Sequence, residues 1–146
     1  MIAYIFQSGD MGYISGQTHG IIAATSDQSL GAQWGCSSTL IVTNTSLGTG
    51  PNNTLAIVNS CSETNVAASI CKNLNSGNYS DWFLPSVEEL KKVYLNRATL
   101  NGLSAYYYWC SSQYDASNAL LVDFSSGIVY YGSKTSPVNV RAVRNF

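Results

Sequence analysis

The sequence predicts an α+β fold, and three observations support that prediction. Strand-like sequence opens the chain, a helix with a well-marked start lies in its middle, and short strands fill residues 106–146. Strands and helices that are separated along a chain in this way pack as helices against an antiparallel sheet. We therefore expect antiparallel sheets with two or three helices packed on one side.

The first elements are two strands and two loops. Ile2–Phe6 reads as a strand, and His19–Ala24 reads as a second one. Residues 7–18 contain three glycines, which predicts a loop or an irregular hairpin between these strands. Residues 37–53 are rich in Ser, Thr, Asn and Gly, so we expect a long surface loop there.

Two short helices are predicted next. Thr54–Asn59 contains a compact apolar set, and Asn65–Asn75 places three apolar residues at four-residue spacing. Gly77 stands where the chain often turns left-handed after a helix end.

The clearest local signal is the segment DWFLPSVEEL at residues 81–90. Ser86 at the N-cap and Glu89 three residues later form a capping box, which marks a helix start. The apolar residues that follow recur at helical spacing. We therefore expect a helix over residues 86–97.

Four short strands are predicted after this helix. They are Tyr106–Ser112, Ala119–Phe124, Ile128–Tyr131 and Val138–Val143. We expect one face of Ile128–Tyr131 to lie in the core. Six of the ten tyrosines lie in residues 106–146, among Ser, Asn, Gln and Asp. This mixture suits a recognition surface, because tyrosine offers rigid amphipathic contact area and short polar residues adapt their hydrogen bonds.

Composition narrows the class of protein. The length of 146 residues favours one domain over residues 1–146. Only 10% of residues are charged and the net charge is -1, which argues against a nucleic-acid partner. No apolar run approaches the ~20 residues of a membrane helix, so we expect no membrane insertion. The uncharged polar surface is typical of exported or virion-surface proteins.

The four cysteines do not form a metal-binding pattern, because no CxxC is present and the one histidine, His19, is distant. Cys71 and Cys110 lie among apolar residues and are expected to be buried thiols. Cys36 and Cys61 lie in polar contexts and are the better disulfide pair. Three pairings remain open if two bridges form.

Six segments of the chain resemble one family. They are residues 17–24, 27–29, 33–36, 79–86, 108–112 and 140–144. Together they look like the Lcl C-terminal domain family, also called DUF1566. The most specific parts are the DWFLPS helix entry and the VRAVR strand. The chain departs from the family at Cys110, where serine is expected.

The resemblance implies a C-type-lectin-like fold, in the branch that holds formylglycine-generating enzymes and the variable proteins of diversity-generating retroelements. Such domains often form the tip of collagen-like adhesins or phage tail fibres. The resemblance thus implies a receptor-binding domain on a bacterial cell surface or a virion. Its partner would be a cell-surface glycan or protein, and a homotrimer is expected because trimers are common in such tips.

The sequence argues against three other functions less strongly or more strongly, according to the residues that each one needs. Calcium-dependent sugar binding needs an acidic motif, but Cys110 and Ser111 follow Trp109 where such a motif would stand. We expect no cofactor, although a structural calcium held by backbone carbonyls would leave no sequence mark. No close cysteine pair supports an enzyme like the formylglycine-generating enzymes, so we expect no catalysis. A structural cap that trimerises a fibre is the remaining alternative.

The expected binding residues form two groups on turns and strand ends. We expect Arg141 and Arg144 to bind backbone groups or carboxylates, and His19 and Asp81 to anchor loops. The binding candidates are Gln113, Tyr114, Asp115, Ser117 and Asn118 in one group, and Tyr130, Ser133, Lys134 and Asn139 in the other.

Overall fold

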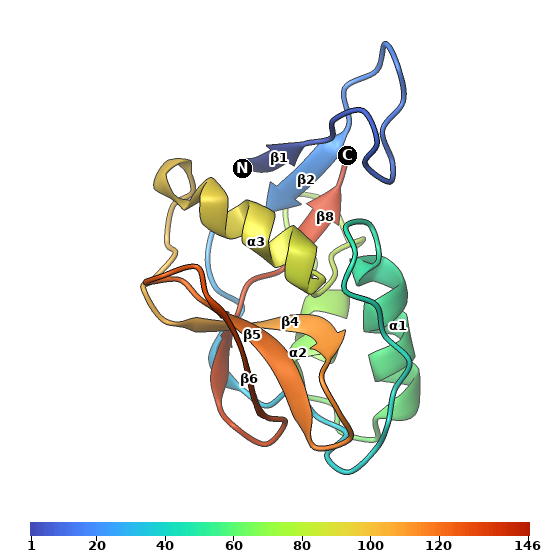
Figure 1. Ribbon diagram of the computed structural model, residues 1–146, viewed down its shortest axis with the longest axis vertical. Coiled ribbons are helices and arrows are strands. Elements are labelled where there is room, and N and C mark those ends of the chain that lie inside the picture. The colour runs from blue at the N-terminus through green and yellow to red at the C-terminus, as the bar shows by residue number, and fades with distance from the viewer.

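The computed structural model describes residues 1–146 and shows a mixed α+β architecture with two sheets and three helices (Figure 1). The strands are β1 (Ile2–Ile5), β2 (Gly20–Ala23), β3 (Ser29–Ala32), β4 (Tyr107–Gln113), β5 (Asn118–Asp123), β6 (Val129–Ser133), β7 (Val138–Val140) and β8 (Val143–Asn145). The helices are α1 (Gly50–Ser60), α2 (Ala67–Lys72) and α3 (Val87–Leu95), and a 3₁₀ turn, η1 (Arg97–Thr99), follows α3.

The smaller sheet joins the two ends of the chain. Its order is β1-β2-β8, and both strand pairs are antiparallel. The terminal ammonium of Met1 donates to the carbonyl of Ala23 at 3.0 Å. Both termini therefore lie together at this end of the molecule (Figure 1).

The larger sheet has the order β3-β7-β4-β5-β6. Its pairs are antiparallel except for β4 with β7, where Tyr108 pairs with Asn139 in parallel. The strand expected at Val138–Val143 is split between the two sheets. The split occurs because Arg141 turns away to bind the carbonyl of Ala24 at 2.7 Å.

The helices divide between the two faces of β4 and β5, whereas we expected them on one side. The division follows from strand alternation, since successive side chains point to opposite faces. One cluster of buried residues joins Trp109 and Leu121 to α1 and α2. The other joins Tyr108 and Val122 to α3.

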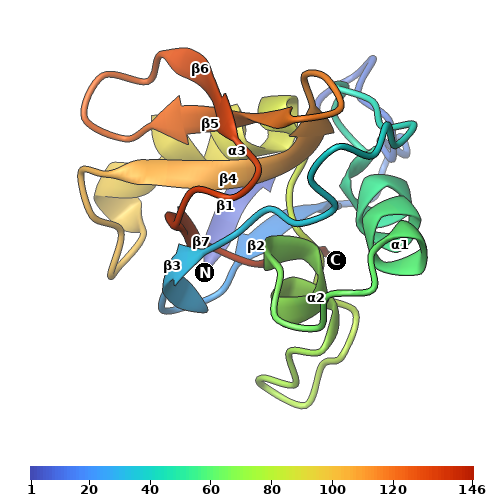
Figure 2. The ribbon, with the colours of Figure 1, turned by 90° about the horizontal axis from the view of Figure 1, so that it is seen from below.

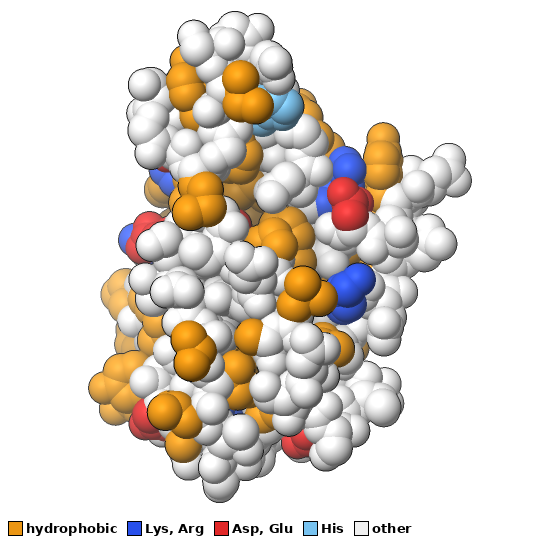
Figure 3. All heavy atoms as spheres, turned by 90° about the vertical axis from the view of Figure 1, so that its right-hand side faces the viewer, with side chains coloured by type: hydrophobic (Ala, Val, Ile, Leu, Met, Phe, Trp, Pro, Cys, Tyr) orange, Lys and Arg blue, Asp and Glu red, His pale blue; other side chains and the backbone are white.

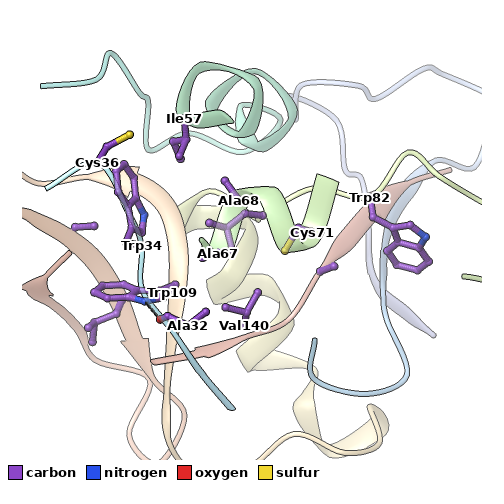
Figure 4. Packing of buried hydrophobic residues seen from close by; sticks show 14 of the residues in the cluster. Ala32, Trp34, Cys36, Ile57, Ala67, Ala68, Cys71, Trp82, Trp109 and Val140 are labelled. Carbon is purple, nitrogen blue, oxygen red and sulfur yellow. Dashed lines mark hydrogen bonds between the residues drawn. The ribbon is translucent and has the colours of Figure 1, made fainter. Parts of the chain in front are cut away.

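The first cluster is built around two tryptophans. Both are fully buried, and each indole N–H reaches a backbone carbonyl of the other's segment. Trp34 Nε1 donates to Cys110 O at 2.8 Å, and Trp109 Nε1 donates to Ala32 O at 2.9 Å. Figure 4 shows the side chains of this cluster arriving from the segment after β3, from α1, from α2 and from β4.

Helix α3 begins as its sequence predicts. Ser86 Oγ accepts from the backbone N–H of Glu89, and Glu89 Oε2 accepts from the N–H of Ser86 at 2.7 Å. Glu89 is fully buried, and its Oε1 accepts from Gly48 N at 2.9 Å. The capping box therefore also ties α3 to the loop before α1.

The predictions for α1 and α2 need correction at their ends. Helix α1 begins at Gly50, inside the expected loop of residues 37–53, and has a proline in its first turn, where the fixed φ favours a helix start. Gly50 also allows close packing, since a Cβ there would lie 2.6 Å from the Phe83 ring. Helix α2 is shorter than expected and covers Ala67–Lys72.

Strand β6 contributes nothing to either buried cluster, so the expectation of a core face was wrong. All four residues from Ile128 to Tyr131 are exposed. The reason is position: β6 is the last strand of its sheet and has a neighbour only on the β5 side. In Figure 2 it lies at the margin of the molecule, on the side opposite α2.

The structure joins Cys36 to Cys61 in a disulfide with a Cα–Cα distance of 5.1 Å. This bond links the segment after β3 to the end of α1. Cys71 and Cys110 are buried free thiols. Burial raises the pKa of Cys71 and raises that of Cys110 to about 12, so both are poor nucleophiles at neutral pH.

Candidate functional site

Five exposed tyrosines lie just before and at the start of β4, on the turn between β4 and β5, and on β6, and we call this surface the tyrosine face. Its members are Tyr106, Tyr107, Tyr114, Tyr130 and Tyr131, with exposed fractions between 44% and 69%. None of their hydroxyls forms a hydrogen bond within the protein, whereas Tyr4 and Tyr108 donate theirs to carboxylates. An exposed aromatic group of this size marks an interaction site more often than an ordinary surface does.

Strand register brings part of this face together. Trp109 pairs with Leu121 and Leu121 pairs with Tyr130, so Tyr107, Leu121 and Tyr130 share one side of the sheet. The rings of Tyr107 and Tyr130 meet edge to face, with centroids 6.1 Å apart. With Tyr131 they line a hollow of about 260 Å³, which we call the outer hollow.

Tyr114 lies on the turn between β4 and β5, and the carboxylate of Asp115 stabilises that turn. Asp115 accepts from the backbone N–H groups of Ser117 and Asn118 at 2.8 and 2.7 Å. These bonds, and the side-chain amide of Asn118, hold the pKa of Asp115 below its usual value. The turn places Tyr114 flat against Tyr131, with ring centroids 4.3 Å apart.

A second, larger hollow shares Tyr107 with the outer hollow, and we call it the inner hollow. Its volume is about 540 Å³, within the usual range for ligand sites. Its lining residues are Leu30, Ser104, Tyr106, Tyr107, Pro137, Val138 and Asn139. Tyr107 thus lines both hollows, and neither of them is lined by a charged side chain.

The acid that pairs with Tyr107 in the neighbouring strand is held by its own turn. Asp123 pairs with Tyr107 across the β4–β5 ladder. Its carboxylate accepts from the hydroxyls of Ser125 and Ser126 at 2.7 and 2.9 Å. These bonds hold the pKa of Asp123 low and direct its charge into the hairpin turn.

Two of the expected binding residues, Lys134 and Gln113, have a structural role instead. Lys134 is fully buried, so the expectation that it lies on the surface was wrong. Its ammonium donates to Thr39 O at 2.8 Å and to Gln113 Oε1 at 2.7 Å, and it lies 4.7 Å from the Trp34 ring centroid. Gln113 Oε1 also accepts from Ile41 N. Lys134 and Gln113 therefore fasten residues 39–41 over the sheet.

The other expected residues divide between the face and its turns. Tyr114 and Tyr130 belong to the tyrosine face, and Asn139 lines the inner hollow. Asp115, Ser117 and Asn118 hold the turn below Tyr114. Ser133 shares a hydrogen bond with Thr135 in the next turn and is not a lining residue of either hollow.

Sequence reasoning missed Tyr106, Tyr107 and Tyr131. Tyr107 lies on the same side of its strand as Trp109, so alternation alone assigns it to the core. Trp109 is covered and Tyr107 is not, because the segment that carries Trp34 and Ile41 packs in the same buried cluster as Trp109, and Tyr107 lies outside that cluster. No local sequence signal marks where that covering segment stops.

The arginines and the loop anchors have their expected partners. Arg141 is buried and its Nε donates to Asp27 at 2.7 Å. Arg144 donates to both oxygens of Asp81 and lies over the Tyr79 ring. His19 shares hydrogen bonds with Phe146 O and Gln17 Oε1. These groups are therefore engaged in holding loops and chain ends together.

Two other features lie outside the tyrosine face. Cys36, Cys61 and Glu63 lie within 4.8 Å of one another, but both sulfurs belong to the disulfide and offer no thiolate. A hollow of about 340 Å³ lies beside Asp81 and Trp82.

The face that carries α1 shows scattered apolar groups and few charges (Figure 3). None of the three helices is long and apolar enough to cross a bilayer.

A comparison with family models matches residues 23–144, and the matching model is described as the Lcl C-terminal domain. The matched region contains both hollows and every member of the tyrosine face. No curated protein matches the chain.

Proposed function

The chain belongs to the Lcl C-terminal domain family, and from this premise we propose that it is a non-catalytic binding module on a bacterial cell or virion surface. The module recognises a glycan or a protein receptor through the tyrosine face. A family of this kind suggests an extracellular surface domain. The adhesin or fibre-tip role and the ligand are parts of the proposal.

One observation carries the proposal: four exposed tyrosines with free hydroxyls line two uncharged hollows on a rigid sheet, and a fifth, Tyr114, stacks on one of them. Tyrosine supplies large contact area at low entropic cost and adds a polar tip, which is why it dominates binding surfaces. The sheet below it is anchored by Trp109 and by the other buried cluster, so the rings are presented on a firm base.

The state of the nucleophiles favours binding over catalysis. Both free thiols are buried and have raised pKa values, and the other two cysteines are joined in a disulfide. His19 is bonded to the chain terminus and to Gln17. Asp81 neutralises Arg144. None of these groups lines the two hollows of the tyrosine face.

The test is binding of the isolated chain to a glycan array and to candidate host cells, with Tyr107→Ala and Tyr130→Ala variants. Each variant is expected to lose about tenfold or more in affinity, as the loss of a tyrosine anchor usually does. Tyr13→Ala is the matched control, since Tyr13 is an exposed tyrosine on the loop between β1 and β2. Equal losses in all three variants, or unchanged binding in the two face variants, would contradict the proposed site.

A second candidate role is a structural cap that trimerises a fibre. The open edge of β6 and its uncharged exposed side chains favour it, because such an edge is usually covered. This role expects the tyrosine face to be buried between subunits. Light scattering decides between the roles, since a monomer that binds its receptor excludes the cap.

A further inference from the structure

Asn101 is the only asparagine in the sequence that a glycine follows. Both residues are exposed on the turn between η1 and β4. Gly102 has a φ of +69°, a left-handed conformation that glycine adopts without strain. Because glycine has no side chain, its backbone nitrogen can approach the carboxamide of the residue before it. The turn is therefore sterically open to a reaction between these two groups.

Neither of the two groups is held by the rest of the protein. The Asn101 carboxamide forms no hydrogen bond within the protein, and the Gly102 N–H donates none. The Asn101 N–H is engaged instead, since it donates to Met1 Sδ at 3.4 Å. The carboxamide carbon and the neighbouring nitrogen are thus free to meet, and their encounter requires no second molecule.

The guanidinium of Arg141 lies against the carbonyl of the same peptide group. Arg141 is fully buried, and its Nη1 donates to Asn101 O at 3.1 Å while its Nη2 donates to Gly102 O. Asn101 O and Gly102 N belong to one resonant amide, so the charge left by loss of the N–H proton resides largely on that oxygen. A cationic donor fixed at the oxygen stabilises this charge.

We infer that Asn101 and Gly102 form a self-modification site, at which the folded chain converts Asn101 to isoaspartate with water as its only co-reactant. The Gly102 nitrogen gives up its proton and bonds to Asn101 Cγ, and the Cγ–Nδ2 bond breaks. The proton leaves with Nδ2 as ammonia, and the chain is left with a five-membered succinimide ring. This inference is independent of the proposed receptor binding.

Arg141 also selects the carbonyl at which water opens the ring. The backbone carbonyl of residue 101 faces the guanidinium, so addition of water there forms an oxyanion beside a cationic donor. The bond from that carbon to the Gly102 nitrogen then breaks. The nitrogen takes one proton of the water, the ammonia takes the other, and a free α-carboxylate remains beside Arg141. The chain path is now one carbon longer, just before Ser104 and Tyr106 of the inner hollow.

The experiment compares two identical tripeptides in one molecule. Ser76→Gly converts residues 74–76 to Leu-Asn-Gly, which is also the sequence of residues 100–102. Asn75 is exposed like Asn101, but no arginine donates to its carbonyl, and the nitrogen that follows it donates to Tyr79 O at 3.0 Å. The whole folded variant is incubated at mildly alkaline pH. Peptide mapping by mass spectrometry follows the loss of the NH₂ group at each site, and isoaspartyl methyltransferase labels the isoaspartate.

Asn101 is expected to react about tenfold faster than Asn75 in the folded chain, which corresponds to about 1.4 kcal/mol of transition-state stabilisation. In urea the two sites are expected to react at the same rate, because Arg141 no longer contacts either peptide. The share of isoaspartate formed at Asn101 should be higher in the folded chain than in urea.

Two further variants test the contacts themselves. Arg141→Lys removes the planar fork and is expected to lower the rate at Asn101 towards that of Asn75, with a smaller share of isoaspartate. Asn101→Gln is expected to leave the turn unmodified over the same period. Thermal melting shows whether the Arg141 variant folds, and the comparison of Asn101 with Asn75 decides the inference without it.

The inference is overturned if Asn75 reacts as fast as Asn101 in the folded chain, or if Asn101 reacts more slowly there than in urea. Aspartate as the main product of the folded chain would also overturn it, and so would a folded Arg141→Lys variant that modifies Asn101 at the unaltered rate.

Discussion

Lys134 is expected from the sequence to lie in the binding site, but the structure places it in the core. Its sequence context, a polar turn after a tyrosine-rich strand, predicts a surface position, yet its ammonium is buried against Trp34 and bonded to Thr39 and Gln113. A long side chain can reach a distant carbonyl, and the distant segment is not visible from local sequence. The expectation that Lys134 lies on the surface and binds a ligand is therefore replaced by a structural role.

Lys134→Ala is expected to lower the free energy of unfolding by about 2–3 kcal/mol, because it removes two hydrogen bonds from a charged donor and leaves Gln113 and Thr39 underpaired. Urea unfolding measures this. Lys91→Ala is the control, since Lys91 forms only an exposed pair with Glu88 and should change stability by less than about 0.5 kcal/mol. Equal losses in both variants would refute the structural role.

The Asp81–Arg144 pair makes stability depend on pH on the acid side. The Arg144 guanidinium, which donates to Asp81 at 2.7 Å, holds the pKa of that carboxyl below its ordinary 3.8. A lowered pKa in the folded state adds stability above about pH 3.8, and this stability is lost as the pH falls through the folded-state value. Asp81→Asn is therefore expected to flatten the loss of stability between about pH 4 and 2 in urea titrations. An unchanged slope would show that the pair contributes nothing.

At the scale of elements, α3 depends on the Glu89 carboxylate, which must accept a hydrogen bond at each of its two oxygens. Glu89 Oε2 accepts from Ser86 N and Oε1 accepts from Gly48 N. Glu89→Gln replaces one acceptor with an NH₂ group that faces a donor, so we expect a loss of about 1–3 kcal/mol. Glu88→Gln is the matched control, because Glu88 is partly exposed and lies one position earlier. Chemical denaturation of both variants checks the difference.

The contrast between α3 and β7–β8 explains how much of the fold could be predicted. A capping box uses residues three positions apart, so the start of α3 at Val87 follows from local sequence. The break between β7 and β8 arises because Arg141 binds groups near residues 24–27 and 101–102, and that partnership exists only in the folded chain. The α+β class was thus predictable, whereas the exchange of a strand between sheets was not.

The candidate site, too, could be predicted from the sequence only in part. Alternation and tyrosine content predicted an aromatic recognition surface on residues 106–146. Tyr114 and Tyr130 are exposed, and their role in recognition stays a prediction. The hollow beside Tyr107 could not be predicted, because it depends on where Leu30 and Pro137 come to lie. Leu30 lies in β3 and Pro137 directly precedes β7, and these two strands meet only in the larger sheet.

For the whole molecule, the Cys36–Cys61 disulfide joins segments 25 residues apart. Closing a loop of this length stabilises a fold by about 3 kcal/mol through restriction of the unfolded chain. The double variant Cys36→Ala, Cys61→Ala is expected to lose that amount in urea unfolding. A reducing agent should lower the stability of the unaltered chain to the same level and leave the double variant unchanged. Loss in the double variant without loss on reduction would point to packing instead.

The open edge of β6 has a consequence for handling the protein at high concentration. Its outer peptide groups have no strand partner, and the run from Ile128 to Tyr131 carries neither a charge nor a proline. Sequences of this kind on a free edge seed intermolecular β-sheet and precipitation. Val129→Lys introduces the charge that natural edge strands often carry, and turbidity on concentration should fall without a drop in melting temperature. Unchanged turbidity would mean that the chain precipitates through another surface.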